Sequence, residues 1–190
     1  MPPPRQRSPL TSTALPFAAA CAALLALGAC RFWRKPPPDL PALANPALDA
    51  RLATLLRYDV PAIGVDSLRR VPPGEVLLLD ARPAGEYAVS HIAGAVRVDP
   101  AGPLPAWIDT LPRERQVTVY CSVGYRSENV ARRLGGAGFT KVNNLYGSLF
   151  DWVDRGLPVV DSAGRPTRRV HTYNRRWGRL LTRPDVEKVW

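Results

Sequence analysis

The sequence predicts an α/β domain built on a central parallel sheet with helices on both faces. Short apolar stretches typical of strands alternate with helix-like stretches along the chain, which is the pattern of repeated strand–helix–strand units. The roughly 130 residues that follow the N-terminal region are enough for one hydrophobic core. No internal repeat indicates two tandem domains. We therefore expect one folded domain over residues 47–160.

The elements can be assigned in chain order. Leu48, Leu52 and Leu55 occur at helical spacing and predict a short amphipathic helix over residues 47–57 that packs on the domain. Runs such as Leu77-Leu78-Leu79 predict buried strands. The predicted strands are 75–80, 95–98, 116–120 and 141–144, and the predicted helices between them are 83–89, 127–136 and 148–154.

Cys121 is the most informative residue, because it lies between a predicted strand and a predicted helix. The loop after it contains Gly124, and Arg126 and Ser127 follow. A tight loop that runs into a helix directs successive backbone N–H groups, and the positive end of the helix dipole, at whatever it encloses. A thiol there should ionise more readily, since these donors and a nearby guanidinium stabilise the thiolate. The alternative is a buried cysteine that acts only as a small hydrophobic residue.

Two ordered motifs carry a family resemblance that extends from about residue 63 to residue 160. The first comprises Leu77-Leu78-Leu79-Asp80-Ala81-Arg82, Glu86-Tyr87 and His91-Ile92-Ala93-Gly94-Ala95. The second comprises Val119-Tyr120-Cys121, Arg126-Ser127, Ala131, Leu134, Gly138-Phe139 and Asn144-Leu145-Tyr146-Gly147. In both, the chain resembles the rhodanese-like sulfurtransferases. Residues beyond Gly164 also resemble an extension found in a bacterial subset of single-domain members.

The resemblance implies a double displacement through a covalent intermediate. Cys121 would take a sulfane sulfur from thiosulfate or a persulfide and pass it to cyanide or to a thiol, which could belong to a protein. No metal or cofactor is implied. Backbone groups around the sulfur would stabilise the anionic persulfide, and Arg126 would brace the loop and add positive potential. The substrate-binding residues implied are Ser122, Val123, Gly124, Tyr125, Arg126 and Ser127.

Two features of the loop narrow the chemistry. Four residues separate Cys121 from Arg126, whereas cysteine phosphatases place five between the corresponding residues, so the spacing favours sulfur transfer over dephosphorylation. Many thiosulfate-using relatives carry a basic residue directly after the cysteine, but here Ser122 offers only a hydroxyl. A persulfide donor is therefore as plausible as thiosulfate. The alternative function is a non-catalytic module of the same fold that binds an anion or a partner protein.

Several other residues are expected to have structural roles. Asp80 and Arg82 flank a strand end and should form a buried or half-buried ion pair. His91 lies in a turn far in sequence from Cys121, so we expect a structural hydrogen bond instead of a papain-like Cys–His arrangement. Packing is the expected role of the tryptophans Trp107, Trp152 and Trp177.

The N-terminus resembles a bacterial lipoprotein signal over residues 1–29. Basic residues precede an apolar stretch over residues 14–29, and small residues lead into Cys30. Cys30 would be lipidated and would hold the domain at the cell envelope, facing the periplasm or exterior. The alternative is an uncleaved membrane helix with the domain in the cytoplasm, which the basic residues after Cys30 favour. Against it, the stretch is short for a span of ~20 apolar residues, and Pro16 interrupts it.

Cysteine and proline usage support this organisation. The three cysteines are Cys21, Cys30 and Cys121, so a chain cleaved before Cys30 keeps one thiol in the folded domain and forms no internal disulfide. A Pro-rich linker over residues 30–46 should act as a semi-rigid spacer between membrane and domain.

The C-terminal extension, residues 161–190, is basic. It holds eight Lys or Arg against three Asp or Glu, in a chain with a formal net charge of +10. No recognisable nucleic-acid-binding motif accompanies this charge, so attraction of anionic substrates, attraction of lipid headgroups, or solubility alone are better explanations. Tyr173, Trp177, Leu180 and Leu181 among the arginines predict that the extension folds back on the domain, where it could cover the Cys121 loop.

Overall fold

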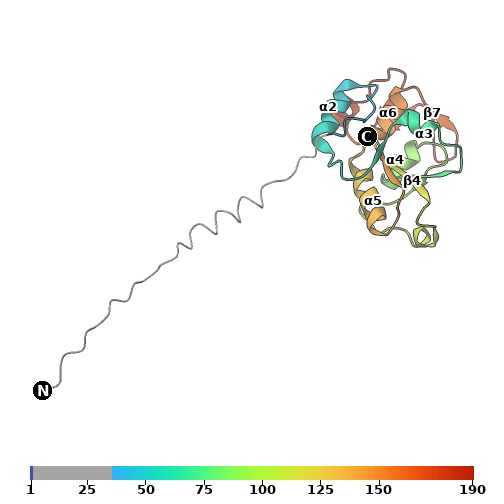
Figure 1. Ribbon diagram of the computed structural model, residues 1–190. Helices are drawn as coiled ribbons and strands as arrows, with labels where there is room; N and C mark the ends of the chain where they lie inside the picture. Colours follow the sequence, from blue (N-terminus) through green and yellow to red (C-terminus); the bar gives the residue numbers. More distant parts are fainter. Residues whose placement is uncertain (2–35) are drawn as a thin grey trace. The chain divides into compact units, whose positions relative to one another are not determined.

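The computed structural model describes Met1 and residues 36–190, and residues 36–190 belong to one compact unit (Figure 1). The predicted signal segment after Met1, Cys30 and the start of the predicted linker lie outside the described residues. Within the described part of the chain, no helix is long and apolar enough to cross a membrane.

A parallel sheet forms the centre of this unit. Within residues 36–190 it has five strands, in the spatial order β1-β5-β4-β2-β3, and each adjacent pair is parallel. The strands are β1 (Ala62–Ile63), β2 (Val76–Asp80), β3 (Val96–Arg97), β4 (Gln116–Tyr120) and β5 (Val142–Leu145). β4 lies between β2 and β5, so the residue after it, Cys121, emerges near the middle of the sheet's carboxyl edge.

Helices cover both faces of the sheet, as the sequence predicted. They are α2 (Pro46–Leu55), α3 (Val65–Arg69), α4 (Ala84–Val89), the 3-10 helix η1 (Ala106–Thr110), α5 (Tyr125–Gly136) and α6 (Ser148–Asp154). Figure 1 shows α2, α3 and α6 on one side of the unit and α5 on the other. The side chains of β4 alternate accordingly: Val117 and Val119 pack with α5, whereas Tyr120 packs with α2 and α6. Burial on both faces is typical of parallel sheets.

Most predicted boundaries agree with the structure to within two residues. The predicted strand 116–120 and helix 148–154 match β4 and α6. α5 begins at Tyr125, two residues earlier than predicted, because Gly124 already occupies the cap position with a φ of 120°. β1 and α3 were not predicted, since each is too short to show a periodic pattern.

The C-terminal extension folds back on the domain, as predicted. It contributes β7 (Pro166–Thr167), β8 (Arg169–His171), α7 (Arg175–Gly178) and β9 (Glu187–Val189); β7 pairs with β6 (Val159–Val160), and β8 pairs with β9. Val170 and Leu181 are completely buried in the same core cluster as α2 and α6. The extension is therefore an integral part of the fold.

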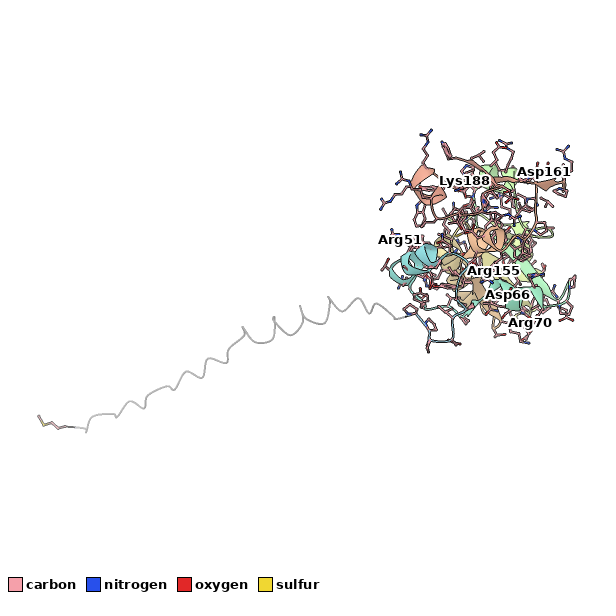
Figure 2. All side chains as sticks on the ribbon, turned by 90° about the horizontal axis from the view of Figure 1, so that it is seen from above. Arg51, Asp66, Arg70, Arg155, Asp161 and Lys188 are labelled. Atoms are coloured by element: carbon pink, nitrogen blue, oxygen red, sulfur yellow. The ribbon has the colours of Figure 1, made fainter. Side chains whose placement is uncertain are left out.

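The end of the predicted linker also packs on the domain. Leu43 is buried in the core, and the Asn45 side chain caps α2 by accepting a hydrogen bond from Ala47 N–H at 2.9 Å. Arg155 follows α6 and donates to Asp66 Oδ2 at 2.9 Å and to the carbonyl of Ala42 at 2.8 Å. Figure 2 labels Arg155 and Asp66 next to each other. The stretch available as a spacer is thus shorter than residues 30–46.

The ion pair expected between Asp80 and Arg82 is present and fully buried. Arg82 Nη2 lies 2.6 Å from Asp80 Oδ2, and both side chains are 0% exposed. The same nitrogen also donates to the carbonyl of Ser90 at 2.6 Å, which ties the end of β2 to the turn after α4. A buried charge without its partner is strongly unfavourable, so each residue of the pair depends on the other.

Substitution Asp80→Asn should therefore destabilise the protein. It leaves the Arg82 guanidinium buried without its counter-charge, and we expect urea denaturation to show a loss of about 3–5 kcal/mol in unfolding free energy. The control is Arg169→Gln, which removes a surface pair with Glu187 whose side chains are 57% and 63% exposed; it should change stability by less than about 1 kcal/mol. Equal effects of the two substitutions would contradict a structural role for the buried pair.

Candidate active site

Cys121 lies directly after β4, and α5 begins four residues later. Its main-chain N–H donates to Ser148 Oγ at 3.2 Å. Gly124 permits the tight connection, because its φ of 120° belongs to the region that side chains other than glycine rarely adopt. Strand, loop and helix therefore place the sulfur at the N-terminal end of α5.

The start of α6 fixes the direction of the loop's peptide groups. Leu149 N–H donates to the Cys121 carbonyl at 3.1 Å, and Phe150 N–H donates to the Ser122 carbonyl at 3.0 Å. In a trans peptide the carbonyl and the following N–H point in opposite directions. With these carbonyls held by α6, the N–H groups of Ser122 and Val123 point away from α6, toward the inside of the loop.

Hydrogen-bond donors surround the sulfur. Gly124 N–H donates to Cys121 Sγ at 3.2 Å, and the first-turn N–H groups of α5 have no partner within the helix. Burial alone would raise the pKa of the Cys121 thiol, but the Arg126 guanidinium and donors from Ser127 and Gly124 outweigh it, so this pKa lies below its ordinary value. The loop thus favours an anionic sulfur.

Arg126 is held by an acidic side chain from α4. Its two terminal nitrogens donate to Glu86 Oε1 at 2.6 Å and to Oε2 at 2.8 Å, and Nη2 also donates to Ser122 Oγ at 2.9 Å. Burial opposes the charge of Glu86, but the Arg126 contact outweighs it, so that the pKa of Glu86 is lowered. Glu86 therefore remains ionised, orients Arg126 and balances its charge.

A second polar contact supports the loop from behind. Asn144 of β5 accepts a hydrogen bond from Ser127 Oγ at 2.7 Å through Oδ1, and its Nδ2 donates to the Gly124 carbonyl at 3.0 Å. Ser127 and Asn144 are both buried. One side chain of the sheet thus connects the loop to the first turn of α5.

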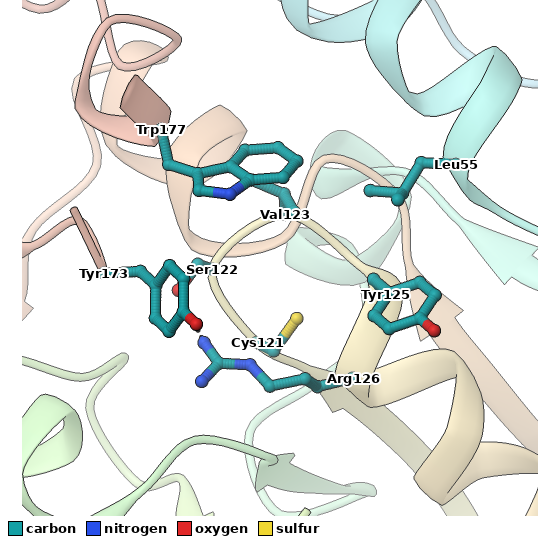
Figure 3. Close-up of a pocket in the computed structure, with 8 residues that line it drawn as sticks. All are labelled: Leu55, Cys121, Ser122, Val123, Tyr125, Arg126, Tyr173 and Trp177. Carbon is teal, nitrogen blue, oxygen red and sulfur yellow. Dashed lines mark hydrogen bonds between the residues drawn. The ribbon is translucent and has the colours of Figure 1, made fainter. Parts of the chain in front are cut away.

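A pocket of about 290 Å³ opens above the sulfur (Figure 3). Cys121 itself is only 1% exposed, so the pocket is the route to its thiol. The pocket is lined by Leu55, Cys121, Ser122, Val123, Tyr125, Arg126, Tyr173 and Trp177.

The structure brings most of the predicted loop residues to this pocket. Gly124 and Ser127 support the sulfur from behind the lining, and Asp80 and Arg82 lie in the core. His91 does not line the pocket; it stacks on Tyr87 with ring centroids 3.8 Å apart. Among the described residues, no group of three or more His, Cys, Asp or Glu side chains is placed to hold a metal ion.

Trp177 packs against the core, as expected, and in addition it lines the pocket. Tyr173 lines the pocket as well, so the extension does cover the Cys121 loop, as the sequence suggested. Leu55 and Glu86 were not assigned to the site. The sequence did offer an indication for Glu86, because this residue belongs to the first motif. It offered none for Leu55, whose surroundings in the sequence resemble those of the other leucines of α2.

The fold and the pocket together define an α/β domain with an anion-stabilising cysteine loop. Residues 67–155 match the Rhodanese-like domain family. A sulfurtransferase of Allochromatium vinosum is 34% identical over 98 residues, which cover 52% of this chain and 91% of that protein. The chain therefore belongs to the rhodanese-like family and has sulfurtransferase homologues.

Two further comparisons agree with this assignment. The putative sulfur carrier protein YrkF of Bacillus subtilis is 32% identical over 98 residues, which cover 50% of this chain and only about half, 52%, of that protein. The solved structure of the BH2092 protein of Bacillus halodurans has a TM-score of 0.50 at 19% identity, with 63% of this chain and 89% of that chain covered. This last likeness bears on the fold alone.

Substitution Arg126→Gln should raise the pKa of Cys121. It removes the positive charge that favours the thiolate and leaves Glu86 as an uncompensated negative charge, and both effects disfavour ionisation. We expect the midpoint of the pH dependence of iodoacetamide alkylation to move up by about one unit or more. Arg132→Gln on the same helix, which removes a pair with Asp59, is the control and should leave the midpoint in place. An unchanged or lower midpoint in the Arg126 variant would refute this assignment.

Proposed function

We propose that this protein is a sulfurtransferase that moves sulfane sulfur through a persulfide on Cys121. The observation that carries the proposal is the sulfur's position at the base of a pocket, where Gly124 N–H donates to it and its pKa is lowered. A nucleophile of this kind needs an ionised sulfur and a place for negative charge after the transfer. The loop offers both.

In the first step, the Cys121 thiolate attacks the outer sulfur of the donor. The new S–S bond forms as the donor's own bond to that sulfur breaks, and sulfite leaves from thiosulfate or a thiol leaves from a persulfide. In the second step, cyanide or a thiol attacks the outer sulfur of the Cys121 persulfide. Thiocyanate or a new persulfide leaves, and the Cys121 thiolate is regenerated.

The surrounding residues stabilise the intermediate. The inward N–H groups of Ser122 and Val123, with those of the first turn of α5, can donate to the outer sulfur of the persulfide. Arg126 adds positive potential and is kept in place by Glu86. The acceptor thiol belongs to a small molecule or to a protein, and the similarity to a putative sulfur carrier protein supports the second possibility.

We further propose that a lipid on Cys30 tethers the domain to the cell envelope, with the pocket facing the periplasm or exterior. The support is the sequence pattern of basic residues, an apolar stretch and small residues before Cys30. A single thiol in the folded domain also suits an oxidising compartment, where additional thiols would tend to form disulfides.

Intact mass spectrometry tests the sulfur transfer. The reduced full chain is exposed to thiosulfate or to a small-molecule persulfide, beside Cys121→Ser, which retains Cys21 and Cys30 as an internal control. We expect the parent to gain one sulfur atom that cyanide or a thiol removes, and the variant to gain none. A folded parent with a free thiol that gains no sulfur from either donor would favour the non-catalytic binding module.

Labelling with a radioactive fatty acid in a bacterial host tests the tether. The parent should be labelled and found in the membrane fraction. Cys30→Ala should lose the label, because it removes the acceptor thiol, while Cys21→Ala, the matched control, should keep it. Membrane recovery of an unlabelled parent, unaffected by Cys30→Ala, would instead indicate an uncleaved helix.

A further inference from the structure

Four apolar side chains surround the space above Cys121. They are Leu55 of α2, Tyr125 at the start of α5, Tyr173 before α7 and Trp177 within α7, and we refer to them as the apolar collar. Figure 3 shows the Cys121 sulfur directed into the space between Trp177, Leu55 and Tyr125. A molecule that delivers or removes sulfur must therefore pass against the collar.

The collar is held in place by contacts outside the loop. The Asn174 side chain caps α7 and accepts a hydrogen bond from Trp177 N–H at 3.0 Å. The Arg51 guanidinium lies over the Trp177 ring, 5.6 Å from its centroid. Asn45 Nδ2 donates to the Leu180 carbonyl at 2.8 Å, which ties the segment after α7 to the start of α2. These contacts hold Trp177 and its segment in position without a bound substrate.

The described lining of the pocket provides no unpaired positive charge to bind a strongly negative donor. Among the described residues that line the pocket, Arg126 carries the one positive charge, and its guanidinium is already bonded through both terminal nitrogens to Glu86. The same guanidinium lies over the Tyr173 ring at 5.9 Å. Ser122, directly after the cysteine, carries no charge. A dianion such as thiosulfate would lose hydration against aromatic rings without gaining an unpaired cation, which is unfavourable.

The volume of the pocket limits the size of the donor group that can lie inside it beside the sulfur. At about 290 Å³ it is near the lower end for small-molecule sites. Aromatic and aliphatic walls of this size fit a short alkyl chain or a single ring beside the reacting sulfur. Contact with such a group would bury apolar surface on both partners, which is favourable.

We propose that the apolar collar selects donors whose sulfane sulfur is carried on a small apolar organic group, with Trp177 and Tyr173 as specificity-determining residues. This inference rests on the proposed sulfur transfer through Cys121. For an organic persulfide, RSSH, the thiolate bonds to the outer sulfur, the bond between the two donor sulfurs breaks, and RSH leaves with the proton. The apolar group R occupies the collar throughout the step.

Three donors are compared to distinguish the effect of the apolar group on kcat/KM from the effect of charge. Benzenethiosulfonate and methanethiosulfonate carry the same single charge and both release a sulfinate, so they differ in the apolar group; thiosulfate differs from methanethiosulfonate mainly in charge. With cyanide as acceptor, we expect kcat/KM of the full chain to be highest for benzenethiosulfonate, about tenfold lower for methanethiosulfonate, and lowest for thiosulfate. Thiocyanate formation is the measured product.

Substitution Trp177→Ala should remove this preference. We expect kcat/KM to fall about tenfold more for benzenethiosulfonate than for methanethiosulfonate. Tyr173→Ala is the second variant, because its side chain is 58% exposed and its truncation does not disturb the core. Trp107→Ala, which is outside the pocket and 38% exposed, is the control and should keep the parent's preference. Deletion of the extension is less informative, since it also removes the buried Val170 and Leu181.

The outcomes distinguish the two proposals. Turnover of all three donors without a preference for the phenyl group, or a preference retained in folded Trp177→Ala and Tyr173→Ala variants, would overturn the role of the collar and leave sulfur transfer intact. Absence of thiocyanate with every donor would overturn both.

Discussion

The hydrogen bonds between the start of α6 and the cysteine loop are the constraint on which the site depends. The N–H groups of Leu149 and Phe150 bind the carbonyls of Cys121 and Ser122, so the loop cannot rotate its peptide groups without breaking two bonds in a buried setting. α5 and α6 both begin at this loop, and each contributes differently: α6 fixes the carbonyls, and α5 presents free N–H groups. The site stabilises an anion because α6 binds the loop's carbonyl groups while N–H groups of the loop and of α5 remain available.

The positive charge of Arg126 in the site is balanced by the negative charge of Glu86. Glu86 holds Arg126 through two short contacts and lies close enough to Ser122 to form a network of three side chains. The network keeps the Arg126 guanidinium near the sulfur, where it lowers the pKa of the thiol, and pairs that guanidinium with Glu86. Under the proposal that the collar binds the donor, activation of the nucleophile and binding of the substrate are served by different groups.

Much of the fold and the core of the site could be predicted from the sequence. β4 and α6 show apolar patterns over enough residues to define their ends. The loop that begins at Cys121 could be recognised because it lies between a predicted strand and a predicted helix and is followed by Gly124 and Arg126. β1 and β6 to β9 were not predicted, because each has only two or three residues and is defined by its hydrogen-bonded partner strand instead of by an apolar pattern of its own. The same limit applies to Trp177, whose place at the pocket depends on how the extension packs against α2 and α6.

The collar comes largely from segments that flank the motif-bearing part of the chain: Leu55 precedes it, and Tyr173 and Trp177 follow it. None of these three side chains forms a hydrogen bond to the Cys121 loop in the described structure, whereas the peptide groups around the sulfur are held by the start of α6. The side chains that we propose to select the donor and the groups that stabilise the sulfur therefore belong to different segments of the chain. Under that proposal, substitutions in the two flanking segments would change the sulfur source without any change in the residues of the reactive loop.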